Sequence, residues 1–290
     1  MKLIQKHFSL YLMFVPILFY FCIFNFYPLI SGFLMSLQKF RLIGDRPFVG
    51  IANYNTVLND PAFWQSLTNT LWIGGGILLL GFVAPIITAL ALNEVLHIVF
   101  KRFIQTVIYI PHLFSWVVVG GIWIFILSPD GGLVNSILTL LGKEEITFLT
   151  NKDYARPIII LSAVWKDMGY NCIIYLAAIT AINPTLYEAA RIDGANRMQE
   201  IRHITLPQLI PTMKIVFLLN LMGVLRIFDQ IFVMRNPAIA GQVDVLMTYV
   251  YEKGILNFNM GVASAASFLV IAATLVLVFI TRKVTKYDLE

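Results

Sequence analysis

The run from Phe8 to Leu37, FSLYLMFVPILFYFCIFNFYPLISGFLMSL, contains no charged side chain. A helix crosses a bilayer with roughly 20 mainly apolar residues, so this run can span with a tilt or a break near Tyr27–Pro28. Lys2 and Lys6 precede it, as basic residues precede the apolar part of a signal peptide. That part is only about 7–15 residues long, and no small-residue cleavage site follows the run. We therefore expect a retained transmembrane helix.

The whole chain has the composition of a membrane protein. Of its 290 residues, 59% are apolar or aromatic and 13% are charged, against roughly 25% charged in an ordinary soluble domain. Mean hydropathy is +0.79. Backbone groups facing lipid must be satisfied within their own segment, which favours helices. We expect an all-α, polytopic membrane protein with about six transmembrane helices, in one domain over residues 1–290. The expected spans are residues 9–37, 67–93, 104–128, 157–182, 209–234 and 260–281.

Charge predicts the orientation. Six spans place both termini on one side, and Lys and Arg favour the cytoplasm. With the termini inside, the inner segments hold ten Lys and Arg residues and the outer loops hold eight. The inner connection from Glu94 to Phe103 is short and basic. We predict cytoplasmic termini in a bacterial cell membrane. The net charge of +5 lies largely at helix ends and short loops, where lipid headgroups explain it better than nucleic acid does.

Several kinds of chemistry find no support in the sequence. No segment has the form G-x-x-x-x-G-K-[ST], so we expect no phosphate-binding loop for ATP. Cys22 and Cys172 lie in apolar runs, and the histidines have no ligand spacing, so we expect no metal site. His112, after Pro111, is expected to be a hydrogen-bonded interior histidine. The close acidic pair Glu144–Glu145 is expected to be a solvated turn. We therefore expect no enzyme activity in this chain.

One predicted inner connection differs from the others. It runs over residues 183–207, where Asn183 is a good helix cap and Pro184 a good first helical residue. Gly194 permits a turn that stops this helix, and a second short helix is expected from Asn196 to a point before Leu206–Pro207. A plain amphipathic connector would also fit this pattern.

The same connection resembles the EAA loop of ABC importer permeases. That pattern reads E-A-A, three residues, G, nine residues, I, one residue, L-P. This chain matches it with Glu188-Ala189-Ala190, Gly194, Ile204 and Leu206-Pro207. The form of residues 189–195 is similar to the carbohydrate-uptake branch. Residues 109–112, 115–118 and 130–135 look like its subgroup for complex oligosaccharides and polysaccharide fragments.

The resemblance implies a type I ABC importer permease fold and a coupling role for this loop. In the family the loop sits in a groove of a cytoplasmic ATPase, and ATP-driven closure switches the paired permeases between inward- and outward-facing states. The implied partners are a second related permease, two ATPase subunits that bind ATP and Mg, an external sugar-binding protein, membrane lipid and an oligosaccharide. The implied coupling residues are Glu188, Ala189, Ala190, Arg191, Asp193, Gly194, Ile204, Leu206 and Pro207.

Polar side chains interrupt the fourth and fifth apolar runs. Ionisable groups there cost at least a few kcal/mol each and normally face a bundle interior or an aqueous cavity. In the fifth run polar and small residues recur at helical spacing, which gives that helix a polar face. The candidates for a substrate pathway are Trp165, Lys166, Asp167, Tyr170, Asn171, Asn220, Arg226, Asp229 and Gln230.

Two interpretations of these residues stay open. In the first, Lys166 or Arg226 pairs with one of the two aspartates and locks the helices together. In the second, the polar groups hydrogen-bond sugar hydroxyls while Trp165 or Tyr170 stacks on a sugar face. The first is favoured for the charged residues and the second for the three amide side chains. Binding would be weak, because an external protein can supply selectivity.

A secondary transporter or a channel without an ATPase partner is the alternative function. Such transporters typically have paired repeats with helices broken at matching positions, and no such pairing is visible here. No segment resembles a selectivity filter. The prediction is therefore a permease subunit of an ATP-driven sugar importer.

Overall fold

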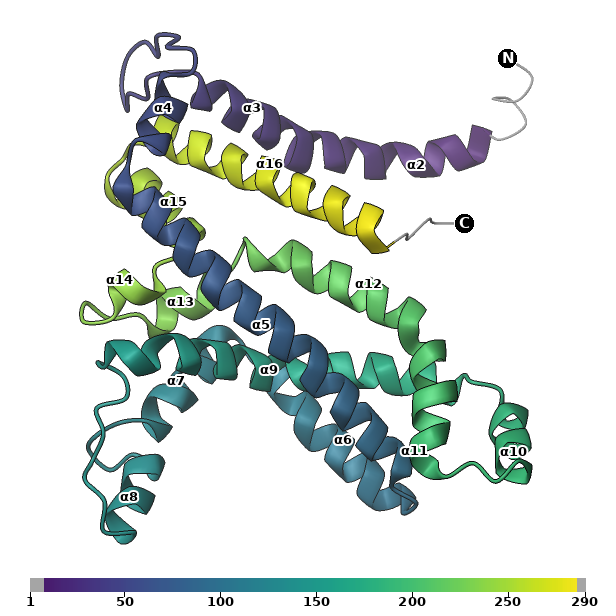
Figure 1. Cartoon of the computed structure of the whole chain (residues 1–290). Helices are drawn as coiled ribbons and strands as arrows, with labels where there is room; N and C mark the ends of the chain where they lie inside the picture. Colours follow the sequence, from purple (N-terminus) through teal and green to yellow (C-terminus); the bar gives the residue numbers. More distant parts are fainter. Residues whose placement is uncertain (1–7, 286–290) are drawn as a thin grey trace. The chain divides into compact units, whose positions relative to one another are not determined.

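The computed structural model describes residues 8–285, so Lys2, Lys6 and Lys286 of the charge argument lie outside the described residues. No β-strand occurs between residues 8 and 285, and the all-α prediction is confirmed (Figure 1). Three π-helical segments are η1 (Cys22–Phe26), η2 (Ile201–Thr205) and η3 (Glu252–Leu256). The α-helices are α2 (Phe8–Phe21), α3 (Tyr27–Ser36), α4 (Ala52–Leu58), α5 (Pro61–Glu94), α6 (Ile98–Leu113), α7 (Trp116–Ile126), α8 (Leu133–Leu140), α9 (Lys152–Thr180), α10 (Pro184–Ile192), α11 (Arg197–Glu200), α12 (Leu206–Val224), α13 (Asp229–Met234), α14 (Ala240–Val243), α15 (Leu246–Tyr251) and α16 (Met260–Thr285).

The number of spans agrees with the prediction. Within residues 8–285, four helical stretches are long and apolar enough to cross a bilayer, and two bent helix pairs raise the total to as many as six. The bent pairs are α6 with α7, at 106°, and α9 with α10, at 66°. The four stretches are Leu10–Ser36, Pro61–Glu94, Arg197–Val224 and Met260–Lys283.

Two predicted spans are not single straight helices. The span expected over residues 104–128 breaks where Phe114 and Ser115 adopt an extended backbone between α6 and α7. The span expected over residues 209–234 ends its first helix at Val224, and α13 begins only at Asp229. Apolar composition alone predicted continuous helices here, because it does not register where the backbone leaves the helical conformation.

Contacts divide the chain into two compact units. The first comprises the described residues up to Phe63 together with Tyr249–Ala272. The second comprises Trp64–Thr248 and the described residues from Ala273 onward. The single-domain interpretation stays a prediction.

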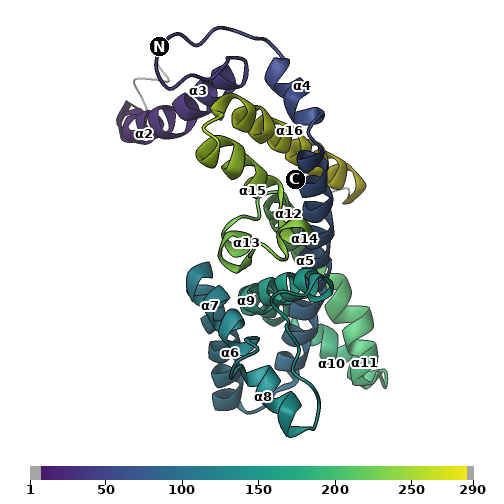
Figure 2. The ribbon, with the colours of Figure 1, turned by 90° about the vertical axis from the view of Figure 1, so that its left-hand side faces the viewer.

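In the second unit, α9 is the central helix. It packs against α6, α7, α12, α13 and α14, and Figures 1 and 2 show α6 and α7 beside it. One apolar cluster joins the C-terminal halves of α5 and α9 to α12. Another joins the N-terminal halves of the same two helices to α13 and the segment that follows it. The middle of α5 and α9, between these clusters, carries polar and small residues.

In the first unit, α2, η1 and α3 form one continuous helical stretch. The tilt or break expected near Tyr27–Pro28 takes the form of a π-helical turn, in which the Tyr27 N–H donates to the Cys22 carbonyl. A proline ring clashes with the carbonyl four residues earlier, and the wider turn before Pro28 relieves that clash.

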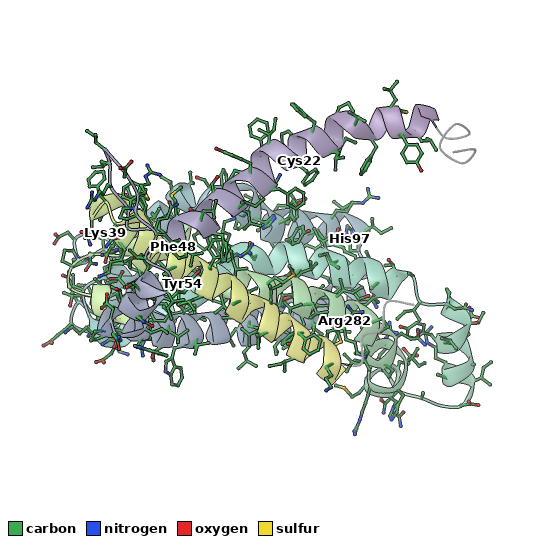
Figure 3. All side chains as sticks on the ribbon, turned by 90° about the horizontal axis from the view of Figure 1, so that it is seen from above. Cys22, Lys39, Phe48, Tyr54, His97 and Arg282 are labelled. Atoms are coloured by element: carbon green, nitrogen blue, oxygen red, sulfur yellow. The ribbon has the colours of Figure 1, made fainter. Side chains whose placement is uncertain are left out.

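Hydrogen bonds from side chains hold the loop after α3. Asn53 donates to the carbonyls of Ser36 and Gln38 at 2.8 and 2.9 Å. The Ser36 and Tyr54 hydroxyls lie 2.8 Å apart. Figure 3 shows Tyr54 at this end of the unit, away from Cys22 on the first helix.

A second polar contact in this unit surrounds Asp60, just before α5. Its carboxylate lies 2.7 Å from Lys253 Nζ and accepts a 2.9 Å hydrogen bond from the Tyr249 hydroxyl. Burial alone would raise the pKa of Asp60. The hydrogen bonds from Lys253, the Ala62 N–H and Tyr249 outweigh that effect and hold the pKa below its usual value.

We expect Asp60→Asn to lower stability at pH 7 by roughly 1–3 kcal/mol, because it removes the charged partner of Lys253. The folded-state pKa of Asp60 is depressed, so its contribution is complete above the unfolded value of about 3.9 and is lost as pH falls through the lower folded value. The gap in melting midpoint between wild type and variant should persist at pH 5 and close below about pH 4. Asp130→Asn, at an exposed aspartate, is the control. A difference in melting midpoint that does not change with pH would contradict this assignment.

Candidate functional site

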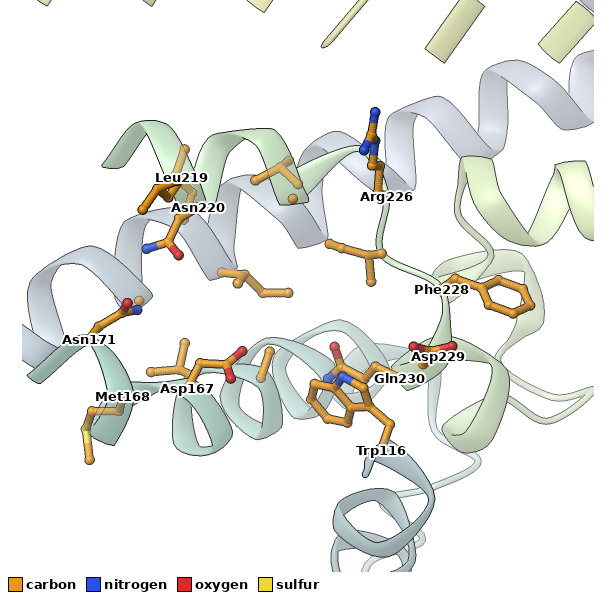
Figure 4. Close-up of a pocket in the computed structure, with 18 residues that line it drawn as sticks. Trp116, Asp167, Met168, Asn171, Leu219, Asn220, Arg226, Phe228, Asp229 and Gln230 are labelled. Atoms are coloured by element: carbon orange, nitrogen blue, oxygen red, sulfur yellow. The ribbon is translucent and has the colours of Figure 1, made fainter. Parts of the chain in front are cut away.

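A cavity of about 280 Å³ lies in the second unit, between the middle of α5, the middle of α9 and the end of α12 (Figure 4). Six of the nine predicted pathway residues line it, and Trp165, Lys166 and Tyr170 do not. The six are Asp167, Asn171, Asn220, Arg226, Asp229 and Gln230. Trp116, at the start of α7, also lines the cavity, and the pathway prediction missed it.

Irregular backbone forms one wall of the cavity. The helix α12 ends at Val224, and the following residues cross to Asp229, where α13 starts. The Arg226 N–H donates to the Gly223 carbonyl at 2.9 Å, which closes the last turn. Non-helical backbone at membrane depth is tolerated where it is buried in protein or lines a cavity, so this break fits its position.

The amide side chains of the cavity have different surroundings. Asn171 and Asn220 lie across from each other, on α9 and α12 (Figure 4). Gln230 is only 2% exposed, and its amide donates to the Ile159 carbonyl at 2.6 Å and to the Ser162 hydroxyl at 2.8 Å. Gln230 therefore ties α13 to α9, while the two asparagines are placed to meet a polar solute.

The ion pairs expected among Lys166, Arg226, Asp167 and Asp229 do not form. Lys166 instead donates to the His112 carbonyl at 2.9 Å, and Asp167 Oδ1 lies 2.9 Å from His112 Nδ1. The side chains of Arg226 and Asp229 make no hydrogen bond or ion pair within the described part of the chain, and they point in different directions in Figure 4. Lys166 and Asp167 on α9 are thus each bound to His112, whereas Arg226 and Asp229 in the cavity wall have no bound partner.

Lys166 and Asp167 stabilise the break between α6 and α7. The last carbonyls of a helix lack partners within it, and the Lys166 ammonium satisfies the one at His112. That ammonium also lies 5.6 Å from the centre of the Trp116 ring. The His112 ring stacks on Tyr170 with centroids 4.5 Å apart, so this histidine is hydrogen-bonded as expected but half-buried rather than interior. Gly169 lets α6 come so close that a Cβ there would collide with the backbone of Ile108.

The connection over residues 183–207 contains the two predicted short helices. The Asn183 side chain accepts from the Thr185 N–H at 3.1 Å and caps α10. Gly194 has φ +81°, a left-handed conformation that glycine adopts without a steric penalty. Asn196 and Gln199 form a reciprocal capping box that begins α11. Local signals were sufficient here, since each bond joins near neighbours in the sequence.

The predicted coupling residues divide by exposure. Glu188, Ala189, Arg191, Asp193 and Gly194 are exposed, as is Pro207. Ala190, Ile204 and Leu206 are half-buried. Ile192, which the coupling hypothesis did not include, is 87% exposed although it is apolar. A hollow of about 300 Å³ lies beside α10 and is lined by Ala190, Asp193, Gly194, Ala195, Gln199, Glu200, His203 and Ile204.

Known proteins resemble the chain over almost its whole length. It is 36% identical to the polygalacturonan/rhamnogalacturonan transport system permease protein YteP of Bacillus subtilis (strain 168), over 98% of this chain and 89% of that protein. It is 34% identical to the arabinooligosaccharides transport system permease protein AraP of the same organism, over 95% and 88%. A chain of the crystal structure of a bacterial ABC transporter that imports the acidic polysaccharide alginate aligns with a TM-score of 0.92 at 35% identity, covering 100% of this chain and 99% of that one.

We expect Lys166→Met to destabilise the purified chain by about 1–3 kcal/mol, because it leaves the His112 carbonyl without its donor. Arg226→Met removes a charge of the same sign that has no bound partner, so its melting midpoint in detergent should stay near that of the wild type. Equal midpoints for the two variants would contradict the division into bound and free charges.

The family model for the inner membrane component of binding-protein-dependent transport systems matches residues 81–286. The resemblance to ABC importer permeases is confirmed, and these are translocation subunits that leave ATP hydrolysis to a separate ATPase. This chain belongs to the inner membrane permease components of binding-protein-dependent transport systems.

Proposed function

We propose that this chain is the transmembrane subunit of an ATP-driven oligosaccharide importer in a bacterial cell membrane, with both termini in the cytoplasm. The proposed complex contains a second related permease, two ATPase subunits that bind ATP and Mg, and an external sugar-binding protein. The similarity to permeases for polygalacturonan or rhamnogalacturonan and for arabinooligosaccharides supports the substrate class. A related alginate transporter was crystallised with a periplasmic protein that held an alginate pentasaccharide, which supports the external partner.

The observation that carries the coupling role is the exposure of α10. This short helix presents Glu188 and the apolar Ile192 on the outside of the protein. The exposure of these two side chains leaves this face of α10 available to a partner, and the match of the segment to the EAA loop supports the ATPase as that partner. In the proposed complex, this face of α10 sits in a groove of the ATPase.

Two helices connect the α10 region with the cavity. One is α9, which bends by 66° into α10 and carries Asp167 and Asn171. The other is α12, which follows η2 and carries Asn220. Displacement of α10 when the ATPase dimer closes would therefore move two walls of the cavity. This is the movement that alternating access needs.

The cavity suits a sugar held by few contacts. Asn171 and Asn220 offer amide donors and acceptors, and the free Asp229 carboxylate accepts hydrogen bonds from hydroxyls. Trp116 offers a flat apolar surface for a sugar ring. A small number of polar groups is appropriate here, because a substrate that must be released should bind weakly.

The coupling proposal is tested in a reconstituted complex with its binding protein and a panel of oligosaccharides. Gly194→Val should abolish sugar-stimulated ATPase activity and uptake, because a β-branched residue is strained at φ +81°. Glu188→Lys should have the same effect by reversing the charge of the docking face. Gly142→Val is the matched control, since Gly142 has φ +70° and equally open space but lies in the loop after α8. Normal transport by both test variants would overturn the coupling role. Uptake that needs no ATP would favour a secondary transporter or a channel.

The pathway proposal predicts a different result for Asn220→Ala. Loss of one hydrogen bond to a sugar should reduce uptake at low sugar concentration by about two- to tenfold. ATPase recruitment and basal hydrolysis should not change, because Asn220 is remote in sequence from α10. Asn55→Ala, at an exposed asparagine outside the cavity, serves as the control. Unchanged uptake by Asn220→Ala would argue against sugar contact at this residue.

A further inference from the structure

Glu200, at the end of α11, is a buried carboxylate in a loop that is otherwise largely exposed. The residue is 2% exposed and belongs to none of the motif positions that carry the family resemblance. Burying a charge is unfavourable unless partners compensate for it. The groups around Glu200 must therefore compensate for its charge.

Two arginines face this carboxylate. Arg191, near the end of α10, donates through Nε to Glu200 Oε1 at 2.7 Å. Arg197, at the start of α11, donates through Nη1 to Glu200 Oε2 at 2.6 Å. Arg197 Nε lies 2.9 Å from Glu94 Oε2, at the last residue of α5. The chain Arg191–Glu200–Arg197–Glu94 alternates in sign and is neutral as a whole.

A second contact joins α10 to the same segment. The Tyr187 hydroxyl of α10 lies 2.9 Å from the Thr205 hydroxyl, and Thr205 Oγ1 donates to the Glu200 carbonyl at 3.5 Å. The exposed side of α10 is therefore free for a partner. Its inner side is held by the contact of Arg191 with the Glu200 carboxylate and by the contact of Tyr187 with Thr205, whose hydroxyl donates to the Glu200 carbonyl.

From this junction, two helical routes lead to the cavity. In one direction α5 runs back from Glu94 to Gly81, a cavity residue about 20 Å away along the helix axis. In the other, α11, η2 and α12 form one long stretch, Arg197–Val224, and bring Asn220 to the cavity about 30 Å from Glu200. Packed helices with discrete arrangements can carry coupling over such distances.

We infer that Glu200 is the positioning residue that passes movement of α10 to α5 and α12. It does not contact the ATPase or the sugar. Its carboxylate holds the Arg191 of α10 against the Arg197 of α11, so that the coupling helix cannot tilt independently of the two helices that line the cavity. This inference rests on the proposed function and assigns the internal link that the proposed function requires.

The role of Arg191 changes accordingly. The resemblance to the EAA loop implied that Arg191 is a coupling residue. Its Nε group is already bound by Glu200, although 57% of its side chain is exposed. Glu188 has no such internal partner among the described residues and remains the outward-facing charge of α10.

The test compares isosteric Glu→Gln variants in the reconstituted complex. Glu200→Gln should lower sugar uptake per ATP hydrolysed by about tenfold, within the range reported for residues on coupling routes, while ATPase recruitment stays at the wild-type level. Glu94→Gln should lower the ratio by about twofold, because its pair with Arg197 is half exposed and exposed pairs are weak. Glu144→Gln, the same change at an exposed outer-loop residue, should have no effect.

The ratio of uptake to hydrolysis distinguishes coupling from folding. A merely structural role would reduce the amount of assembled complex and leave the ratio unchanged, and this outcome would overturn the inference. A normal ratio for Glu94→Gln beside a low one for Glu200→Gln would overturn the route through α5. If Glu200→Gln does not assemble, Arg191→Gln, which keeps the Glu200–Arg197 pair, should show the low ratio, and a normal one would refute the link. Failure of the wild-type complex to couple ATP to uptake would instead count against the proposed function.

Discussion

A hydrocarbon layer offers no water to a backbone group that a helix break leaves unpaired, so the protein itself must supply every missing partner. This constraint explains the middle of the second unit. The carbonyl that the break after α6 frees at His112 receives the Lys166 ammonium. At the break after α12, the Arg226 N–H closes the last turn, and the residues that follow line the cavity. The helix breaks, the buried charges and the cavity therefore occur together, because the charges supply partners to the backbone groups that the breaks leave unpaired, and the cavity gives the irregular backbone a place away from lipid.

The central helix α9 meets this constraint with a short polar stretch. Ser162 accepts from Gln230 of α13, and Asp167 lies against His112 of α6. Two residues later, Gly169 lets α6 approach its backbone. Apolar clusters at both ends of α9 supply the remaining contacts. Charges that would be costly in lipid are thus placed where they hold helices together, while Arg226 and Asp229 lie among the residues that line the cavity.

The loop around α10 uses the opposite arrangement. Its outer face keeps Glu188 and Ile192 exposed, which leaves a surface for a partner in the proposed complex. Its inner face is ordered by a neutral chain of charges around Glu200. An isolated pair of short helices is only marginally stable in water, so the shape of α10 depends on this inner face as well as on its caps. The loop is therefore ordered on its inner face while its outer face stays exposed.

The sequence by itself determined the apolar spans, the two short helices between Asn183 and Pro207 and the family, because hydropathy, caps and turns act between near neighbours along the chain. Six of nine pathway candidates reached the cavity, since helical spacing identifies a polar face. Only the tertiary structure decided that Lys166 binds the His112 carbonyl, that Trp116 lines the cavity and that Arg191 faces Glu200. Those partners lie on different helices, and spacing within one helix carries no information about which atoms stand across an interface.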